Sequence, residues 1–422
     1  MQNPALTSAS RKVRLRLIPF LILCYFVSYL DRVNIGFAAL TMNADLGIGP
    51  EAFGFTAGIF FLGYCLFEVP SNVMLARFGA RLWIARIMIT WGLVSMAMAF
   101  VTGPLSLAAA RFLLGVAEAG FFPGIIFYLT RWVPAGDRAS TVSAFMVAVP
   151  VSALIGAPLS GWILDAFNGV AGLQGWQWLF IVEALPAVLL GVVVLFFLDD
   201  KPEDARWLTA DERAALAGTI TEEDRAKPAS GHMTLRQALT DGRVLSLSLV
   251  YFGIVCGLYS LTFWTPQIVK AFGYSNLQTG FIAAIPFLAG ALVMNAWGRH
   301  SDKSGERVWH VALPSFLGAM GLMAGALVSE PALALLALTV AALGIFAALP
   351  AFWTLPTAML SGTAAAGAIA LINSIGNTGG FAGPYVVGWL KGAGLSSGAA
   401  VAAIASVMVL SGVVALAQRQ PR

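Results

Sequence analysis

Charged residues are scarce in this 422-residue chain, where they make up 11% of the sequence. A soluble protein has about 25% charged and about 45–50% apolar residues, whereas 59% of this chain is hydrophobic and its mean hydropathy is +0.81. No globular core could bury so many apolar side chains. The composition excludes an ordinary soluble enzyme, a disordered protein and a nucleic-acid binder, and it predicts that the lipid bilayer surrounds the chain.

Cysteine and histidine are also rare, at three residues each. The cysteines lie far apart in apolar runs and form no CxxC pair; they are Cys24, Cys65 and Cys256. The histidines lie in or beside polar loops; they are His232, His300 and His310. Because the sequence brings no His, Cys and carboxylate residues together, we expect no metal site, no cofactor and no enzyme activity.

Long apolar runs make up most of the remaining sequence. A spanning helix needs about 20 mostly apolar residues, and twelve such runs occur, six on each side of a polar stretch from Asp199 to about Asp241. The runs are residues 15–41, 53–75, 82–102, 105–130, 141–165, 177–198, 243–270, 279–298, 308–328, 332–357, 364–390 and 396–417. The sequence therefore predicts an all-α integral membrane protein with twelve transmembrane helices.

The basic residues predict the orientation. With twelve spans, both termini lie on one side, and the loops of that side hold almost all lysines and arginines outside the spans. The loops of the other side hold only Lys270 and Lys391. The positive-inside rule predicts that both termini and the central loop are cytoplasmic, in the plasma membrane or, in a bacterium, the inner membrane.

Two features recur at one spacing. The segment Ala76–Arg81 follows the second span and Asp302–Arg307 follows the eighth, 226 residues later, and Pro158 and Pro384 have the same offset. The repeat predicts two pseudo-symmetric six-helix bundles, an architecture of transporters with the site between the halves. The predicted parts are a tail, a bundle, a linker loop, a second bundle and a tail, at residues 1–14, 15–198, 199–242, 243–417 and 418–422.

Four charged residues stand out deep inside predicted spans, where each charge exposed to lipid costs roughly 2.5–3.5 kcal/mol. They are Asp31, Arg32, Arg111 and Glu118. Seven helical steps of about 100° return almost to the starting direction, so Arg111 and Glu118 share one face, which Gly115 leaves open. Intramembrane charges of this kind are candidate functional residues, although a static buried cluster that fixes helix packing is the alternative.

Two further carboxyl groups lie within spans. Glu68 is near the cytoplasmic end of the second span, where both a packing role and a transport role are open. Glu183 is near the outer end of the sixth span, where we expect a structural role. The second half has almost no charge in its spans. Its candidate substrate-binding residues are uncharged hydrogen-bonding and aromatic side chains, which would contact the part of the substrate away from the carboxylate. They are Tyr251, Trp353, Asn373 and Asn377.

Several motifs together resemble the anion:cation symporter family of the major facilitator superfamily. They are Tyr29–Gly36, Gly63-Tyr64 with Glu68–Asn72, Arg77–Arg81, Arg111–Gly120, Pro202–Leu208 and Asn373–Asn377. The resemblance covers nearly the whole chain and implies proton-driven uptake of organic anions such as sugar acids, tartrate and aromatic acids by alternating access. It also implies that the acid and arginine of the first span, and the arginine and glutamate of the fourth, carry coupling and anion recognition.

We therefore expect Arg32 to clamp the substrate carboxylate, because a guanidinium can donate two parallel hydrogen bonds, with Tyr29 and Tyr64 beside it. Arg111 is a second binding residue, or it holds Asp31 or Glu118. Asp31 and Glu118 are the expected proton-coupling residues. The loop motif predicts gating residues, although Ala76 stands where the superfamily usually has aspartate; they are Arg77, Gly79, Arg81, Asp302, Lys303, Gly305 and Arg307.

The four intramembrane charges sum to zero when ionised, so one proton per substrate carboxyl group would keep a loaded site neutral. The predicted partners are a small organic anion, protons and the bilayer, with no nucleic acid, and we expect a monomer. An organic anion exchanger, an exporter of the same fold and an anion sensor are the alternatives. The sequence leaves open which anion is carried and with how many protons.

Overall fold

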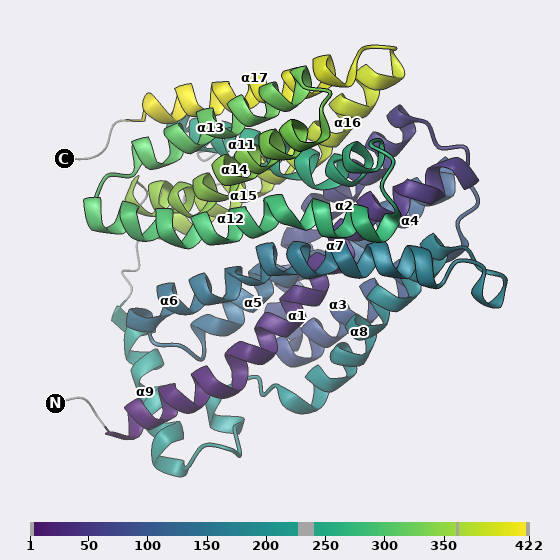
Figure 1. Cartoon of the computed structure of the whole chain (residues 1–422). Coiled ribbons are helices and arrows are strands. Elements are labelled where there is room, and N and C mark those ends of the chain that lie inside the picture. The colour runs from purple at the N-terminus through teal and green to yellow at the C-terminus, as the bar shows by residue number, and fades with distance from the viewer. Residues whose placement is uncertain (1–3, 227–239, 360–362, 419–422) are drawn as a thin grey trace.

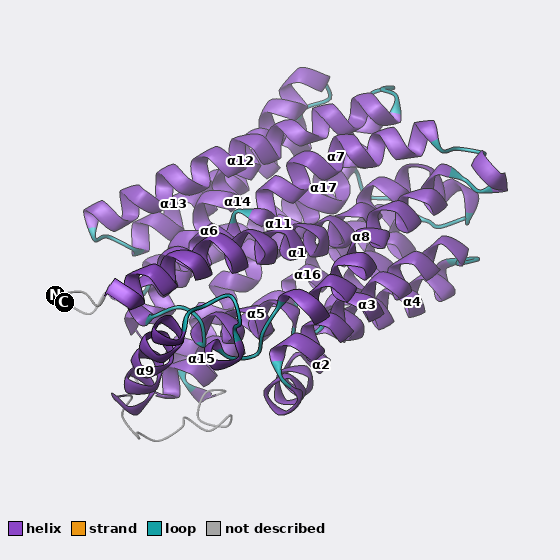
Figure 2. Cartoon of the chain, turned by 90° about the horizontal axis from the view of Figure 1, so that it is seen from below, coloured by secondary structure: helices purple, strands orange, loops and turns teal. Residues whose placement is uncertain are grey.

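The computed structural model describes residues 4–226, 240–359 and 363–418, and for a few residues within these ranges, Asp302 among them, the backbone alone. Every regular element in the described ranges is helical (Figure 2). The first half contains α1 Pro4–Asp45, α2 Pro50–Phe78, α3 Ala80–Ala97, η1 Met98–Phe100, α4 Pro104–Glu118, α5 Phe121–Thr130, α6 Ala135–Met146, α7 Ala148–Ala166, η2 Val170–Gly172 and α8 Gly175–Phe197.

The linker and the second half follow. The linker contains η3 Pro202–Asp204 and α9 Ala210–Ala226. The second half contains α11 Gly242–Lys270, α12 Asn276–Ser304, α13 Val308–Leu327, α14 Pro331–Met359, α15 Thr363–Asn377, α16 Gly379–Gly392 and α17 Ser397–Leu416.

Eleven segments in the described ranges are long and apolar enough to cross a membrane. The predicted span at residues 364–390 is not among them, because it is divided near Thr378 into α15 and α16, which are both too short to qualify alone. The two pieces follow one another and together cover the predicted span. The all-helical membrane fold is therefore confirmed, and this span is built from two helical pieces.

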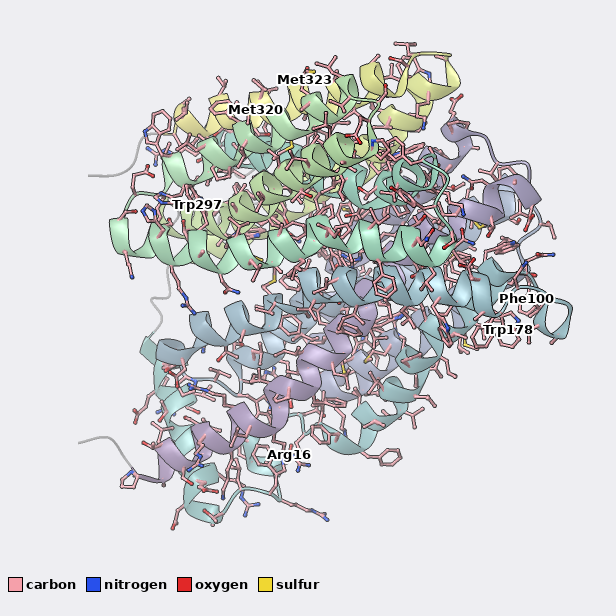
Figure 3. All side chains as sticks on the ribbon, in the orientation of Figure 1. Arg16, Phe100, Trp178, Trp297, Met320 and Met323 are labelled. Atoms are coloured by element: carbon pink, nitrogen blue, oxygen red, sulfur yellow. The ribbon has the colours of Figure 1, made fainter. Side chains whose placement is uncertain are left out.

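The helices form two bundles, α1–α8 and α11–α17, and α1 begins at the same end of the molecule where α17 finishes (Figure 1). Large apolar side chains point away from the bundles, as Met320 and Met323 do on α13 (Figure 3). Phe100 and Trp178 lie at the end of the molecule opposite Trp297 (Figure 3). An apolar belt with aromatic residues towards both ends fits a bilayer.

The bundles meet along α2 with α16, α7 with α12 and α1 with α11. Glycines make the contact close: a Cβ on Gly54 would lie 2.4 Å from the Pro384 carbonyl oxygen, and one on Gly280 would lie 2.4 Å from the Ala157 oxygen. Asp165 at the end of α7 also accepts hydrogen bonds from the side chain of Asn276 and the backbone of Leu277, at 2.7 and 2.9 Å. These contacts lie towards the predicted outer ends of the helices and hold the bundles together there.

Candidate functional site

The centre of the site is a buried ion pair between α1 and α4. Arg32 pairs with Glu118, and the Ser28 hydroxyl donates to the same Glu118 oxygen at 2.8 Å. Arg32 also donates to the Tyr259 hydroxyl on α11 at 3.3 Å. Arg32, and not Arg111, therefore holds Glu118, and it reaches across from the first bundle to the second.

Asp31 points away from this pair, as adjacent residues on a helix must. Its Oδ1 accepts hydrogen bonds from Ser95 on α3 at 2.5 Å and from the Asn34 amide at 3.0 Å. Its other oxygen has no hydrogen bond among the described residues. Asp31 is thus a second buried carboxyl group of the first bundle, separate from the one on Glu118.

Arg111 is fully buried on α4 and donates to the Ala57 carbonyl of α2 at 3.0 Å. Its Nε and Nη1 have no hydrogen bond among the described residues. The guanidinium groups of Arg111 and Arg32 lie 5.0 and 5.2 Å from the centre of the same Phe60 ring. Two cations therefore flank one aromatic side chain, and one of them retains unused donors.

The sequence predicts that Gly115 leaves the face of Arg111 and Glu118 open, and this prediction is wrong. A Cβ at this position would lie 2.0 Å from the Phe60 carbonyl oxygen. The absence of a side chain lets the backbone of α2 pack directly on α4, which is the usual role of small residues between membrane helices. Gly115 is a packing residue, and α2 fills the space beside it.

The fourth span breaks directly after Glu118. Ala119 is extended and Gly120 has a φ of 86°, a conformation that glycine adopts without strain. A Cβ on Gly120 would also lie 2.4 Å from the Ser71 hydroxyl. Glu118 therefore sits at the broken end of a helix inside the membrane, a feature of transporter binding sites.

The structure places two predicted aromatic residues, Tyr29 and Tyr64, beside Arg32. Its guanidinium lies 5.6 Å from the Tyr29 ring and 5.3 Å from the Tyr64 ring, within the range of cation–π interactions. In the second bundle Tyr251 stacks on Phe352 and meets the Trp353 ring edge-on at 4.9 Å. These contacts form an aromatic cluster on α11 and α14.

Glu68 takes part in a contact between the bundles. Its carboxylate accepts a hydrogen bond at 3.0 Å from the Asn373 amide on α15. Asn377, one turn further along α15, is half-buried and makes no side-chain hydrogen bond in the described part of the chain. The two asparagines share a helix face, but they do not share this contact.

Sequence reasoning missed several of these contacts. Tyr259 is a polar aromatic residue of the seventh predicted span, but no sequence pattern places it beside Arg32. Ser28, one helical turn before Arg32, and Ser95, which binds Asp31, were not singled out. Serines inside spans on the faces that carry the charges were the only available signal, and such serines are common in membrane helices.

The first predicted gating loop is held by the linker. Gly79 has a φ of 89°, and the Arg81 backbone N–H donates to the Asp200 carboxylate at 2.9 Å. The Arg81 guanidinium lies 3.9 Å from the same carboxylate, and the Arg77 guanidinium lies over the Phe78 ring. Asp200 thus supplies a carboxylate at this loop, where Ala76 cannot.

The second gating loop is organised differently. Gly305 ends α12 with a φ of 68°, Lys303 is exposed, and Arg307 donates to the Ser301 hydroxyl at 2.9 Å. The side chain of Asp302 lies outside the described residues. Burial raises the pKa of Glu306, but hydrogen bonds from the Trp309 backbone and from His310 outweigh it, so this pKa lies below its ordinary value.

Comparison with known proteins identifies the family of the chain. The sequence profile of the Major Facilitator Superfamily matches residues 21–384. The "Putative tartrate transporter" of Agrobacterium vitis is 53% identical over 99% of this chain and 96% of its own length. The "Quinolone resistance transporter" of Acinetobacter baumannii is 43% identical over 90% of this chain and 88% of its own.

The fold also matches solved structures. A crystal structure of a D-xylose-proton symporter superposes with a TM-score of 0.75 at 16% identity, over 94% of this chain and 96% of that one. At this identity the likeness concerns the fold alone.

Proposed function

The chain belongs to the Major Facilitator Superfamily, and we propose from this premise that it imports a small organic anion together with protons by alternating access. It is a multi-pass membrane transporter and not an enzyme, as its family and relatives are transporters. The anion is a carboxylate of the tartrate or sugar-acid kind. The loops rich in lysine and arginine support an orientation with both termini cytoplasmic, in the bacterial inner membrane, and we propose that the monomer is the working unit.

The observation that carries the proposal is the unused hydrogen-bonding capacity of Arg111 beside Arg32. A fully buried guanidinium with two unpaired nitrogens is costly unless an anion or water completes it. Both arginines lie against the ring of Phe60. They can bind the carboxylate groups of one small anion, with the tyrosines around Arg32 and the second bundle contacting the remainder.

Coupling follows from competition for Arg32. When a substrate carboxylate pairs with Arg32, Glu118 loses its cation partner. An unpaired buried carboxylate is strongly unfavourable, so Glu118 takes up a proton. The linkage is reciprocal, because a protonated Glu118 releases Arg32 for the anion.

Uptake by purified protein in proteoliposomes tests this function. L-Tartrate is the first probe, followed by other small carboxylates that raise the melting temperature. Wild type should accumulate the probe when the outside is acidic. Glu118→Gln should keep counterflow at equal pH and lose at least about tenfold of the pH-driven uptake. Glu203→Gln, an exposed carboxyl group of the linker, is the control. Full pH-driven uptake by Glu118→Gln would remove Glu118 from the coupling mechanism.

Export is the second candidate, because the quinolone resistance transporter is also a close relative. An exporter would lower the accumulation of a quinolone in cells that overproduce the chain. An anion importer would leave quinolone accumulation unchanged and would support growth on its anion.

A further inference from the structure

Glu183 on α8 is a buried carboxyl group that the proposed coupling does not use. Its side chain is 1% exposed, and its Oε1 accepts a hydrogen bond from Ser160 on α7 at 2.7 Å. Its Oε2 has no hydrogen bond among the described residues. The sequence suggested a structural role near the outer end of the span, but a structural carboxyl group would be expected to use both oxygens.

Asn34 links Glu183 to the site. The Asn34 amide nitrogen donates to Asp31 at 3.0 Å, and the same side chain also interacts with Glu183. Within the described part of the chain the Asn34 carbonyl oxygen has no hydrogen bond, like the second oxygens of Asp31 and Glu183. The Asn34 amide nitrogen therefore faces both carboxyl groups, and a single amide side chain lies between Asp31 and Glu183.

The electrostatics favour one shared proton. Asp31 on α1 is the titratable residue whose charge acts on Glu183 among the described residues, and Ser160 on α7 is its neutral hydrogen-bond partner. Two carboxylates whose charges act on one another in a dry region cannot both be ionised cheaply. One negative charge is balanced by Arg111, whose charge acts on Asp31.

Depth in the membrane gives the order of the two groups. At 1.5 Å per residue, Glu183 lies about 12 Å from the outer start of α8, and Asp31 lies about 21 Å from the outer end of α1. Glu183 is therefore on the outer side of Asp31. A proton that comes from outside would meet Glu183 first.

We propose that Glu183 is a third proton-handling residue, which holds a proton on the outer side of the site and passes it to Asp31. In the transfer the Glu183 carboxyl group becomes a carboxylate and the Asp31 carboxylate becomes a carboxyl group, so the pair keeps one negative charge. Asn34 holds both groups in place. This inference rests on the proton-coupled function proposed above.

The test compares two modes of transport by Glu183→Gln, which keeps the shape of the side chain. With L-tartrate as the probe, counterflow at equal pH should stay within about twofold of wild type, and pH-driven uptake should fall about tenfold. Full pH-driven uptake, or an equal loss of both modes, would overturn the inference. Ser160→Ala keeps the carboxyl group but removes its hydrogen bond, and it should shift the pH of half-maximal uptake, which a purely structural role would not do.

A measurement without substrate separates this inference from the proposed function. The infrared absorption of protonated buried carboxyl groups should lose intensity in Glu183→Gln at neutral pH. An unchanged spectrum would overturn the inference even if the chain proves to be a symporter. A wild type without pH-driven uptake, together with a changed spectrum, would overturn proton coupling while still placing a proton on Glu183.

Discussion

The two bundles bring different polar groups to their interface. The first bundle supplies buried ions from α1 and α4, which are Asp31, Arg32, Arg111 and Glu118. Within the site, the second bundle supplies a phenol and an amide to contacts across the interface, Tyr259 to Arg32 and Asn373 to Glu68. The buried ion pair of the site lies wholly inside the first bundle.

This distribution determines what a relative movement of the bundles costs. Removing one partner of a buried ion pair costs about 3–5 kcal/mol, whereas a hydrogen bond between a charged and a neutral group contributes about 1.5–3 kcal/mol. Because no ion pair of the described site crosses the interface, rocking breaks only the weaker kind of contact. The comparison indicates that proton coupling takes place within the first bundle. It also indicates that the second bundle contributes only uncharged groups to the described site and moves relative to the first.

The largest effect should come from Arg32→Ala, which removes the cation of the buried ion pair. Glu118 would be left buried without its partner, so the free energy of unfolding should fall by about 3–5 kcal/mol, and the thermal shift by tartrate should disappear. Unfolding in detergent, with and without tartrate, measures both. Adding Glu118→Gln should restore most of the stability but none of the binding. Undiminished tartrate binding by Arg32→Ala would show that another residue clamps the anion.

Close packing inside the first bundle gives the next effect. Gly115→Ala places a methyl group against the Phe60 carbonyl oxygen and forces α2 and α4 apart. Overpacking of this kind costs about 1–3 kcal/mol, so the melting temperature should fall. Gly136→Ala on α6 is the matched control, because nothing lies within 4 Å of its added Cβ. If both variants have the same melting temperature, the packing of α2 on α4 at Gly115 does not contribute to stability.

The neutral contact across the interface should matter less for stability than the ion pair does. Tyr259→Phe removes the 3.3 Å hydrogen bond to Arg32 and leaves the ion pair intact, so the free energy of unfolding should fall by about 1.5 kcal/mol, the lower end for a hydrogen bond to a charged group. The KM for tartrate uptake should rise up to about tenfold, since each tenfold change corresponds to about 1.4 kcal/mol. Tyr385→Phe, a ring stacked on Phe381, is the control. A loss of stability as large as that of Arg32→Ala would contradict the interpretation that only weaker, uncharged partners from the second bundle cross the interface.

Local sequence rules predicted the spans and the charges but not their partners. Hydropathy located the helices and the charges inside them, and the seven-residue spacing predicted that Arg111 and Glu118 share one helix face. Which arginine holds Glu118 depends on how α1 crosses α4, and no periodicity encodes that crossing. The contact of Glu68 with Asn373 joins positions 305 residues apart, so it exists only once the two bundles have docked. Gly115 was misread for the same reason, since its neighbour belongs to another helix.

The smallest effect concerns the linker, which the structure attaches to the first bundle. Glu212 on α9 accepts hydrogen bonds from Lys12 and Ser8 on α1, at 2.8 and 2.7 Å. The Lys12 bond, then those from Ser8 and the Thr209 backbone, lower its pKa from the ordinary 4.5 to about 2. A lowered pKa in the folded state means that this contact stabilises docking above about pH 4.5 and is lost as the pH falls towards 2.

Glu212→Gln should therefore raise the hydrogen-exchange rate of the α9 amides a few-fold at neutral pH, after correction for intrinsic rates. In wild type this corrected rate should rise as the pH falls from 4.5 to 2, and the variant should lose that pH dependence. Glu222→Gln, exposed on the same helix, should change neither. Because α9 packs on α1, the amides of α11–α17 should keep their protection. Faster hydrogen exchange throughout the second bundle would instead mean that the linker stabilises both bundles, and docking of α9 would then not be a property of the first bundle alone.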